Sequence, residues 1–195
     1  DAVQKRISSR IGLRDTYYGD TISSSKKESS SYKYADNSWR KEKQTNMTIH
    51  GGAGSIVSTS GDLVKFMNAL ISYKLVSKKS LDKMKTMVDG YGMGLFADQY
   101  GSKPSFGHNG RIEEFYSALW HFPAEKLTIA YCSNGIYFPR TDIIEGILKI
   151  CFNEPFQLPF SALSDLSSTD LDKYIGTYTS EQVPIKVVCT KLNTQ

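Results

Sequence analysis

Residues 106–110 read FGHNG and place His108 between two glycines. A histidine gains or loses its charge near neutral pH, so it can hold an anionic group or take part in proton transfer. A glycine lets another chain approach the backbone closely, because it has no side chain. The segment fits either a strand that borders a cleft or an ordinary turn, and the surrounding sequence has to distinguish the two.

A second kind of chemistry needs a serine followed three positions later by a lysine, because one helical turn then brings the amine beneath the hydroxyl. Such pairs in the chain include Ser23 with Lys26, Ser24 with Lys27, Ser30 with Lys33, and Ser80 with Lys83. The first three lie in a polar segment with no apolar stripe after them, and the fourth lies in the helical segment SKKSLDKM. The abundance of Ser and Lys explains all four, so we assign none as a nucleophile.

The remaining histidines and acids give weaker signals. His121 alternates with apolar neighbours and fits a structural position, whereas His50 precedes two glycines and fits either a loop or the wall of a cleft. Glu113 and Glu114 follow the FGHNG segment and could rim the same cleft. An acid–base pair needs a second carboxylate held opposite the first, and the sequence does not place one.

The three cysteines, Cys132, Cys151 and Cys189, are far apart in the chain. They lack the paired spacing of a zinc site or a disulfide framework, so we expect small buried apolar residues. No His, Cys and Asp cluster has the spacing of metal ligands. We therefore predict neither a metal nor a cofactor.

The chain has 195 residues, of which 39% are hydrophobic, so it can bury one sizeable core. The net charge of +4 comes from residues 1–50, which carry ten Lys and Arg against six Asp and Glu. A nucleic-acid-binding face needs basic residues gathered on a folded surface, and this pattern is missing. No apolar run has the length of a membrane span and no signal peptide begins the chain. Because Asp1 is not an initiator methionine, we expect a start that has been cut or processed.

Apolar spacing predicts three helical segments in the first half of the chain. The first covers residues 3–11 and ends at Gly12, and it is followed by a polar surface excursion over residues 21–46 that contains Tyr32, Tyr34 and Trp39. A second helix begins with a cap at residues 58–60 and points inward with Leu63, Phe66, Met67 and Leu70. A third has Ser77 as its cap and points inward with Leu81, Met84 and Val88.

From residue 91 the spacing of apolar residues changes to the two-residue alternation typical of strands. Residues 91–96, 115–122 and 126–133 read as strands, and the last two are joined by the four-residue loop PAEK. A helix with Thr141 as its cap follows, and its inward positions are Ile144, Ile147, Leu148 and Cys151. Residues 154–168 read as a Pro- and Ser-containing linker, and residues 169–195 begin a further strand-rich element. This order predicts an antiparallel meander covered by helices.

In this order the segments resemble the C-terminal part of the serine β-lactamase and D-Ala-D-Ala peptidase superfamily, in its class C-like serine hydrolase branch. The stretches that carry the resemblance are IGLRDTYYG, GGAGSIVSTSGDLVKFMNAL, FGHNGRIEEFYSALWHFPAEKLTIAYCSN and LDKYIGTY. Together they span most of residues 11–178. Each motif alone is common, and their order makes the resemblance specific.

The resemblance implies that His108, Asn109 and Gly110 occupy the family's third active-site element, on a strand that borders the cleft. A substrate amide would lie against this strand as an added strand. The backbone N–H of Arg111 would point into an oxyanion hole. His108 would supply a hydrogen bond or a positive charge near a substrate carboxylate and the proton-transfer groups.

The family also uses a Ser-x-x-Lys nucleophile and a Tyr-x-Asn or Ser-x-Asn element, both upstream of the matching region. Tyr-x-Asn and Ser-x-Asn do not occur in this sequence. We therefore expect the C-terminal portion of a hydrolase that forms an acyl-enzyme with a β-lactam, a D-Ala-D-Ala peptide or a small ester. By itself the chain is expected to be inactive. The alternatives are a non-catalytic binding or scaffold protein, and a chain that pairs with a separate N-terminal half or with itself.

The sequence thus predicts an α+β fold, with an antiparallel sheet and helices packed on its faces. The predicted domains are residues 1–153 as part of the hydrolase domain, 154–168 as a linker, and 169–195 as the start of a β-rich module. The resemblance implies an exported, periplasmic or membrane-anchored bacterial protein. The residues that select the substrate cannot be identified from the sequence.

Overall fold

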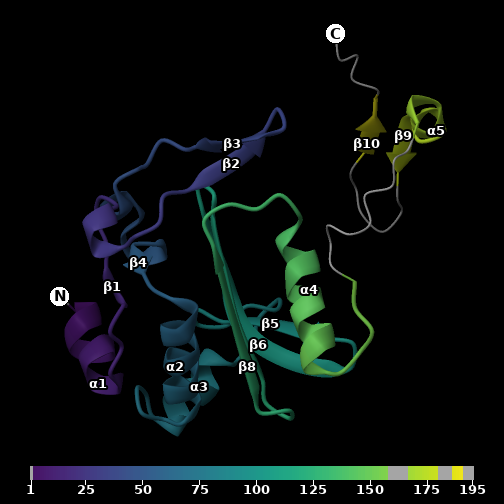
Figure 1. Ribbon diagram of the computed structural model, residues 1–195. Coiled ribbons are helices and arrows are strands. Elements are labelled where there is room, and N and C mark those ends of the chain that lie inside the picture. The colour runs from purple at the N-terminus through teal and green to yellow at the C-terminus, as the bar shows by residue number, and fades with distance from the viewer. Residues whose placement is uncertain (1, 158–166, 180–185, 191–195) are drawn as a thin grey trace. The chain divides into compact units, whose positions relative to one another are not determined.

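A computed structural model describes residues 2–157, 167–179 and 186–190 (Figure 1). The chain divides into two compact units, Asp1–Phe156 and Gln157–Gln195. The larger unit contains all the residues that the sequence assigns to a site. The predicted domain limits at residues 153 and 168 stay a prediction.

A four-stranded sheet forms the centre of the larger unit. Its strands are β5 (Phe96–Tyr100), β6 (Lys103–Ile112), β7 (Phe115–Phe122) and β8 (Leu127–Ser133). They pair in the order β5-β6-β7-β8, and each pair is antiparallel. Because every hairpin joins sequence neighbours, the sheet is the meander that the sequence predicts.

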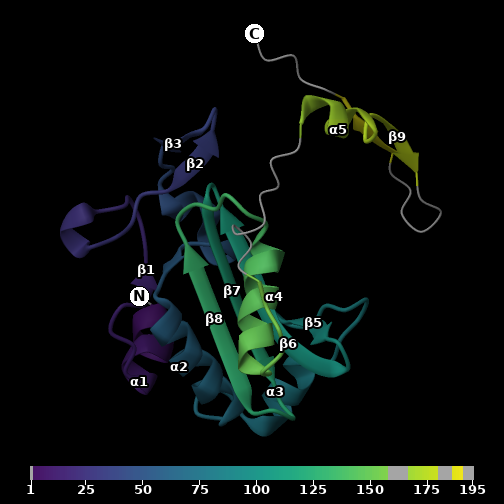
Figure 2. The same cartoon turned by 45° about the vertical axis from the view of Figure 1, so that its right-hand side comes forward.

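Helices cover both faces of this sheet (Figure 2). On one face α2 (Ser60–Ile71) and α3 (Lys78–Met84) bury the cluster Met67, Leu70, Leu81, Leu95 and Phe106. On the other face α4 (Arg140–Cys151) covers the cluster Ala118, Trp120, Phe122, Ile129 and Leu148. Successive residues of a strand point to opposite faces, so one strand can supply both clusters. The predicted α+β class is confirmed.

Two predicted helix starts agree with the structure and one does not. The Thr59 and Ser77 side chains accept hydrogen bonds from backbone N–H groups of the first turns of α2 and α3. The predicted cap Thr141 is wrong, because Pro139 stands at the N-cap and α4 begins at Arg140. Proline suits this place, since it has no N–H that a helix start would leave unpaired.

Several predictions of which residues are buried, and of where a strand begins, also need correction. Val88 is 71% exposed, because α3 ends at Met84 and Val88 belongs to a tight turn. The strand predicted at residues 91–96 begins only at Phe96, since the Gly92 N–H donates to the Leu95 carbonyl (2.7 Å) and bends the chain. The prediction of buried cysteines is wrong, since Cys132 and Cys151 are exposed and Cys189 is half-buried. Cys151, three residues after Leu148, lies at the margin of the apolar stripe of α4.

The N-terminal segment is helical and is tied to α2. A π-helical turn η1 (Gln4–Ser8) runs into α1 (Ser9–Ile11), which ends at Gly12 with φ +70° as predicted. Buried Asp62 of α2 accepts hydrogen bonds from the Asp15 N–H (2.8 Å) and the Thr16 hydroxyl (3.0 Å). A short pair of strands, β1 (Tyr17–Tyr18) and β4 (Ile56–Val57), follows.

The polar excursion contains η2 (Ser24–Lys26) and the hairpin of β2 (Tyr32–Ala35) and β3 (Ser38–Lys41), and η3 (Met47–Ala53) follows it. The Tyr34 ring packs edge-on against Trp39 (5.2 Å between centroids) and Tyr137 (4.3 Å). The Tyr32 N–H donates to the Asn134 carbonyl (2.7 Å). The hairpin is therefore held against the segment between β8 and α4.

The smaller unit contains α5 (Ser168–Asp172) and a pair of antiparallel strands, β9 (Gly176–Thr179) and β10 (Lys186–Cys189). The Ser167 hydroxyl and the Asp170 carboxylate form a capping box at the start of α5. Most of the predicted linker, residues 158–166, lies outside the described residues.

We expect the isolated chain to self-associate at tens of micromolar. Among the described strands, β8 pairs with β7 alone, so its other edge presents unpaired backbone groups. Such edges recruit further strands. Several apolar side chains of the larger unit are also exposed: Ile49, Ile56, Val88, Met93 and Ile150. Light scattering should therefore give a mass above that of one chain, and a monomer mass across this concentration range would contradict the prediction.

Candidate active site

The FGHNG segment lies within β6, and its last three residues, His108, Asn109 and Gly110, extend beyond the pairing with β5. Pairing between β5 and β6 ends at Phe96 and Gly107, whereas pairing between β6 and β7 continues to Ile112. From His108 to Ile112, β6 thus has no partner strand on the side away from β7, among the described residues. We call this side of residues 108–112 the open edge.

The contacts of Arg140 show which backbone groups face the open edge. Arg140 Nη1 lies 3.1 Å from the Gly110 oxygen and 3.5 Å from the Ser117 oxygen. One nitrogen can reach both oxygens only if the paired residues Gly110 and Ser117 direct their carbonyls toward each other's strand. In an antiparallel ladder the next residue points the opposite way. The N–H and C=O groups of Asn109 and Arg111 therefore face the open edge.

The His108 side chain lies at the same edge. Its ring is exposed and lies against Phe96 (4.5 Å between centroids) and Tyr91 (6.1 Å). Its Nδ1 is 2.5 Å from the Asn109 carbonyl oxygen. Because a carbonyl only accepts, Nδ1 carries the proton, and Nε2 of the neutral ring is then an acceptor. His108 is thus built to take a proton or a hydrogen bond at Nε2.

Two segments flank the open edge. At its His108 end, Val88 and Tyr91 exchange backbone hydrogen bonds (3.0 Å each) across Asp89 and Gly90, which have φ of 51° and 80°. Positive φ at both positions is typical of a type I′ turn, and this turn carries the Tyr91 ring toward His108. At the other end, Gly54 meets the Ile112 side chain, which leaves no room for a Cβ atom. A side chain at position 54 would have to push Ile112 aside.

The side chain of Arg111 is held away from the open edge. Its guanidinium lies over the Tyr116 ring (5.0 Å) and pairs with the Glu114 carboxylate (3.2 Å). Glu114 also accepts from the Tyr116 hydroxyl (2.8 Å). Glu113 accepts from the Thr45 N–H (2.7 Å), so it holds the end of the excursion. The two acids therefore anchor neighbouring groups and do not form an acid–base pair.

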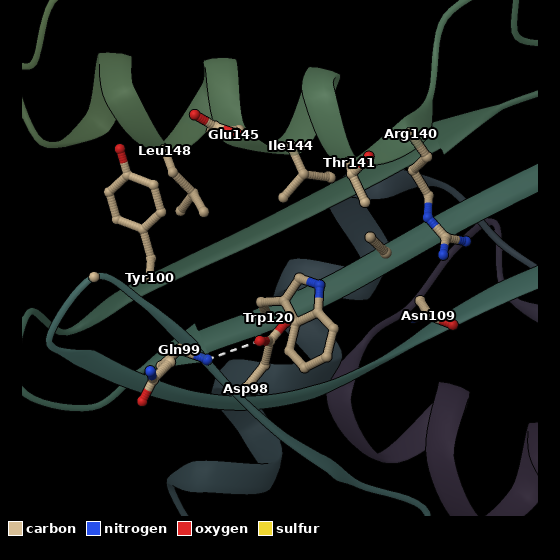
Figure 3. Close-up of a pocket in the computed structure, with 12 residues that line it drawn as sticks. Asp98, Gln99, Tyr100, Asn109, Trp120, Arg140, Thr141, Ile144, Glu145 and Leu148 are labelled. Carbon is tan, nitrogen blue, oxygen red and sulfur yellow. Dashed lines mark hydrogen bonds between the residues drawn. The ribbon is translucent and has the colours of Figure 1, made fainter. Parts of the chain in front are cut away.

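The side chain of Asn109 lines a different hollow, between β5–β7 and α4 (Figure 3). This cleft has a volume of about 270 Å³ and includes Trp120 and Arg140. In Figure 3 the Arg140 side chain extends from the start of α4 toward the strands below it. The structure thus brings His108, the Arg111 N–H and the Asn109 backbone to one edge, but places the Asn109 side chain elsewhere.

Sequence reasoning missed Arg140, Tyr91 and Phe96 as neighbours of the edge. One sequence signal was available for Arg140. A cation in the first turn of a helix is unfavourable beside the positive end of the helix dipole, which indicates that the residue has a role other than helix stability. Nothing in the sequence predicts the contacts of Tyr91 and Phe96 with His108.

The other candidate residues lie in varied places. Ser80 and Lys83 are exposed on α3, and the Ser80 hydroxyl lies 3.0 Å from that of Ser77. His50 is half-buried in η3, and its Nε2 is buried and has no hydrogen-bond partner in the described part of the chain. Among the described residues, no group of three His, Cys, Asp or Glu side chains is placed to hold a metal ion.

His121 is buried beneath α2, as the structural interpretation predicts. Its Nδ1 lies 2.9 Å from the Thr128 hydroxyl, which donates to the Asn68 side-chain oxygen (3.1 Å). Thr128 uses its proton for Asn68, so Nδ1 of His121 is the donor in the first bond. Burial lowers the pKa of His121; a hydrogen bond with the Leu127 backbone opposes this effect and Lys85 adds to it.

This pKa predicts a loss of stability in mild acid. The unfolded chain takes up the proton near pH 6.5, whereas the folded chain takes it up only at lower pH. The free energy of unfolding should therefore fall as pH drops from 7 toward 5, by at most about 1.4 kcal/mol per pH unit from this group. Urea unfolding should show a flatter pH profile for His121→Gln than for the wild-type chain. Identical profiles would contradict this prediction.

The comparison with protein families identifies the class of the chain. The family model for beta-lactamase matches residues 1–150. The chain therefore belongs to the beta-lactamase family, which also fits the penicillin-binding proteins among its structural neighbours. Among curated proteins, no match was found.

Several solved structures share the fold. A D-stereospecific amidohydrolase from a Streptomyces species is 27% identical with a TM-score of 0.60, over 69% of this chain and 43% of that chain. The D-amino acid amidase from Ochrobactrum anthropi SV3, complexed with D-phenylalanine, is 25% identical with a TM-score of 0.63, over 78% and 53%. An octameric penicillin-binding protein homologue from Pyrococcus abyssi is 20% identical with a TM-score of 0.65, over 95% and 44%. The chain thus spans about half the length of these proteins.

Proposed function

We propose that the protein to which this chain belongs is a serine hydrolase that acts through an acyl-enzyme. The observation that carries the proposal is the open edge, where no described strand pairs with the N–H and C=O groups of Asn109 and Arg111 and where His108 Nδ1 donates to the Asn109 carbonyl. A substrate amide can add to such an edge as a further strand. Membership in the beta-lactamase family supports this use of the edge.

In this proposal the chain supplies electrostatic stabilisation and proton handling. The substrate lies along residues 108–112, and the Arg111 N–H donates to the oxygen that gains negative charge when the carbonyl is attacked. His108 Nε2 accepts a hydrogen bond or a proton near the reacting groups. The nucleophilic serine comes from a Ser-x-x-Lys element outside residues 1–195.

The proposed substrates are peptide-like amides, β-lactams or small esters. The amide class has the most support, because two similar proteins are named as a D-stereospecific amidohydrolase and a D-amino acid amidase. The exposed Tyr91 ring beside His108 would contact a substrate side chain at that end of the edge. Carboxypeptidase activity on D-Ala-D-Ala peptides remains within the same proposal.

We also propose that the whole protein is exported from a bacterial cell, to the periplasm or to a membrane anchor. Within the described ranges, no helix combines the length and the apolarity needed to cross a bilayer. Cell fractionation with an antibody against this chain tests the proposal, which fails if the protein is recovered with cytoplasmic markers.

The second candidate is a binding or scaffold protein that keeps the open edge without a nucleophile. The Ser-x-x-Lys pairs in this chain favour it, since none of them combines a helix start with a buried lysine. The coding sequence upstream of the Asp1 codon distinguishes the two candidates. An in-frame Ser-x-x-Lys that opens an apolar helix, followed by Tyr-x-Asn, supports the hydrolase. A start codon just before the Asp1 codon, or an upstream domain without these elements, supports the scaffold.

A further inference from the structure

We propose that Arg140 is a positioning residue that polarises the Gly110–Arg111 peptide group and so strengthens the Arg111 N–H as a donor at the open edge. The catalytic consequence rests on the proposed function. The polarisation itself does not, because it is a property of this chain.

The contacts place a cation on the far side of that peptide group. Arg140 Nη1 donates to the Gly110 oxygen at 3.1 Å and, more weakly, to the Ser117 oxygen at 3.5 Å. Both contacts are partly buried. Among the described residues Arg140 makes no ion pair, so no carboxylate competes for its charge.

The Gly110 carbonyl and the Arg111 N–H belong to the same planar peptide group. In a trans peptide the two bonds point in opposite directions, which is why the carbonyl faces β7 while the N–H faces the open edge. A hydrogen bond from a charged donor draws electron density toward the oxygen and leaves the N–H more positive. The partial burial of the contact preserves this effect, because water screens it less.

The position of Arg140 in α4 fits a role other than helix stability. Arg140 is the first residue of the helix, where the backbone dipole disfavours a cation and favours an acid such as Asp142. The two carbonyl oxygens offset this cost. Pro139 at the N-cap fixes the backbone just before Arg140, and Figure 3 shows the side chain reaching from there toward the strands.

The experiment compares the wild-type chain with Arg140→Met, which removes the charge at similar volume, and with Thr141→Ala, a neighbour that lines the same cleft without contacting either carbonyl. The one-bond coupling between the Arg111 nitrogen and the Gly110 carbonyl carbon reports on polarisation of the peptide. It should decrease in Arg140→Met, and the coupling across Ser117–Ala118 should decrease less. Thr141→Ala should change neither. Equal couplings in all three folded chains would overturn the proposal.

The rate of hydrogen exchange at the Arg111 amide distinguishes polarisation of the peptide from a merely structural role of Arg140. A less polarised N–H is less acidic, so exchange should become several-fold slower in Arg140→Met. If Arg140 only stiffens the strand, its loss should make exchange faster or leave it unchanged, and either result contradicts the proposal. If Arg140→Met does not fold, the wild-type chain still decides: its Gly110–Arg111 coupling must exceed that of the other β6 peptides.

Failure of this inference and failure of the proposed function are distinguishable. We use "the longer gene product" for the proposed protein that contains this chain and the Ser-x-x-Lys element. If that protein forms no acyl-enzyme but the nitrogen–carbon couplings change as expected, the hydrolase proposal fails and the polarisation stands. If the longer product is active, Arg140→Met should lower kcat roughly tenfold with little change in KM, because the donor acts in the transition state. An unchanged kcat would remove the catalytic part of the inference.

Discussion

Replacing Gly107 with alanine is expected to unfold the sheet or to shift its register. A Cβ atom at this position would lie 1.9 Å from the Leu119 carbonyl oxygen and 2.9 Å from the Trp120 Cα atom. Both are backbone atoms of β7, so they can move only by breaking the ladder. Overpacking with movable side chains already costs about 1–3 kcal/mol, and this clash should cost more. Such a loss is a large part of the roughly 5–15 kcal/mol that stabilises a domain.

Gly110→Ala is the matched control in the same strand. Its Cβ would meet the Ser117 hydroxyl at 2.6 Å, and that atom can rotate away. We expect a change in the free energy of unfolding of less than about 1 kcal/mol. Urea unfolding followed by far-UV circular dichroism compares the two variants. If Gly107→Ala is as stable as Gly110→Ala, the close approach of β6 to β7 is wrong.

Arg111→Pro is expected to lower kcat of the longer gene product by about 10²–10³, the usual effect of losing one oxyanion donor. Proline has no N–H, and the Arg111 N–H faces the open edge, so no bond to β7 is lost. The fold should therefore survive while the donor disappears. The measurement is steady-state hydrolysis of a D-amino acid amide by the purified longer protein.

Two control variants isolate this donor. Arg111→Ala loses the contacts with Tyr116 and Glu114 but keeps the N–H, so it should retain most of kcat. Asn109→Pro introduces the same ring at the other edge-facing position and leaves the Arg111 N–H in place. If the three variants lose activity equally, the effect comes from strand distortion and the oxyanion assignment is wrong.

Local signals predicted much of the fold. Gly12 ends the first helix, Ser77 caps α3, and alternation in residues 115–133 gives the β7–β8 hairpin. Each of these depends on neighbouring residues alone, which is why the sequence suffices. The failures at Val88 and Cys151 arose where an apolar pattern was extended past the end of a helix or to its margin.

The site was predictable only in part. The position of His108 follows from its motif, but the open edge depends on where β5 ends, and strand length is not readable from residues 91–100. The contact of Arg140 with Gly110 joins residues thirty positions apart. Such a contact depends on how α4 packs on the sheet, and the sequence places neither the helix axis nor the side chain.

The most direct test of the central claim is covalent labelling of the longer gene product and of the isolated chain with a fluorescent penicillin and a fluorescent phosphonate, followed by mapping of the labelled peptide. We predict that at least one probe labels the longer protein at a serine outside residues 1–195, within Ser-x-x-Lys, and that neither labels the isolated chain. A label on any serine of residues 1–195, or no label on the folded longer protein, would contradict the account.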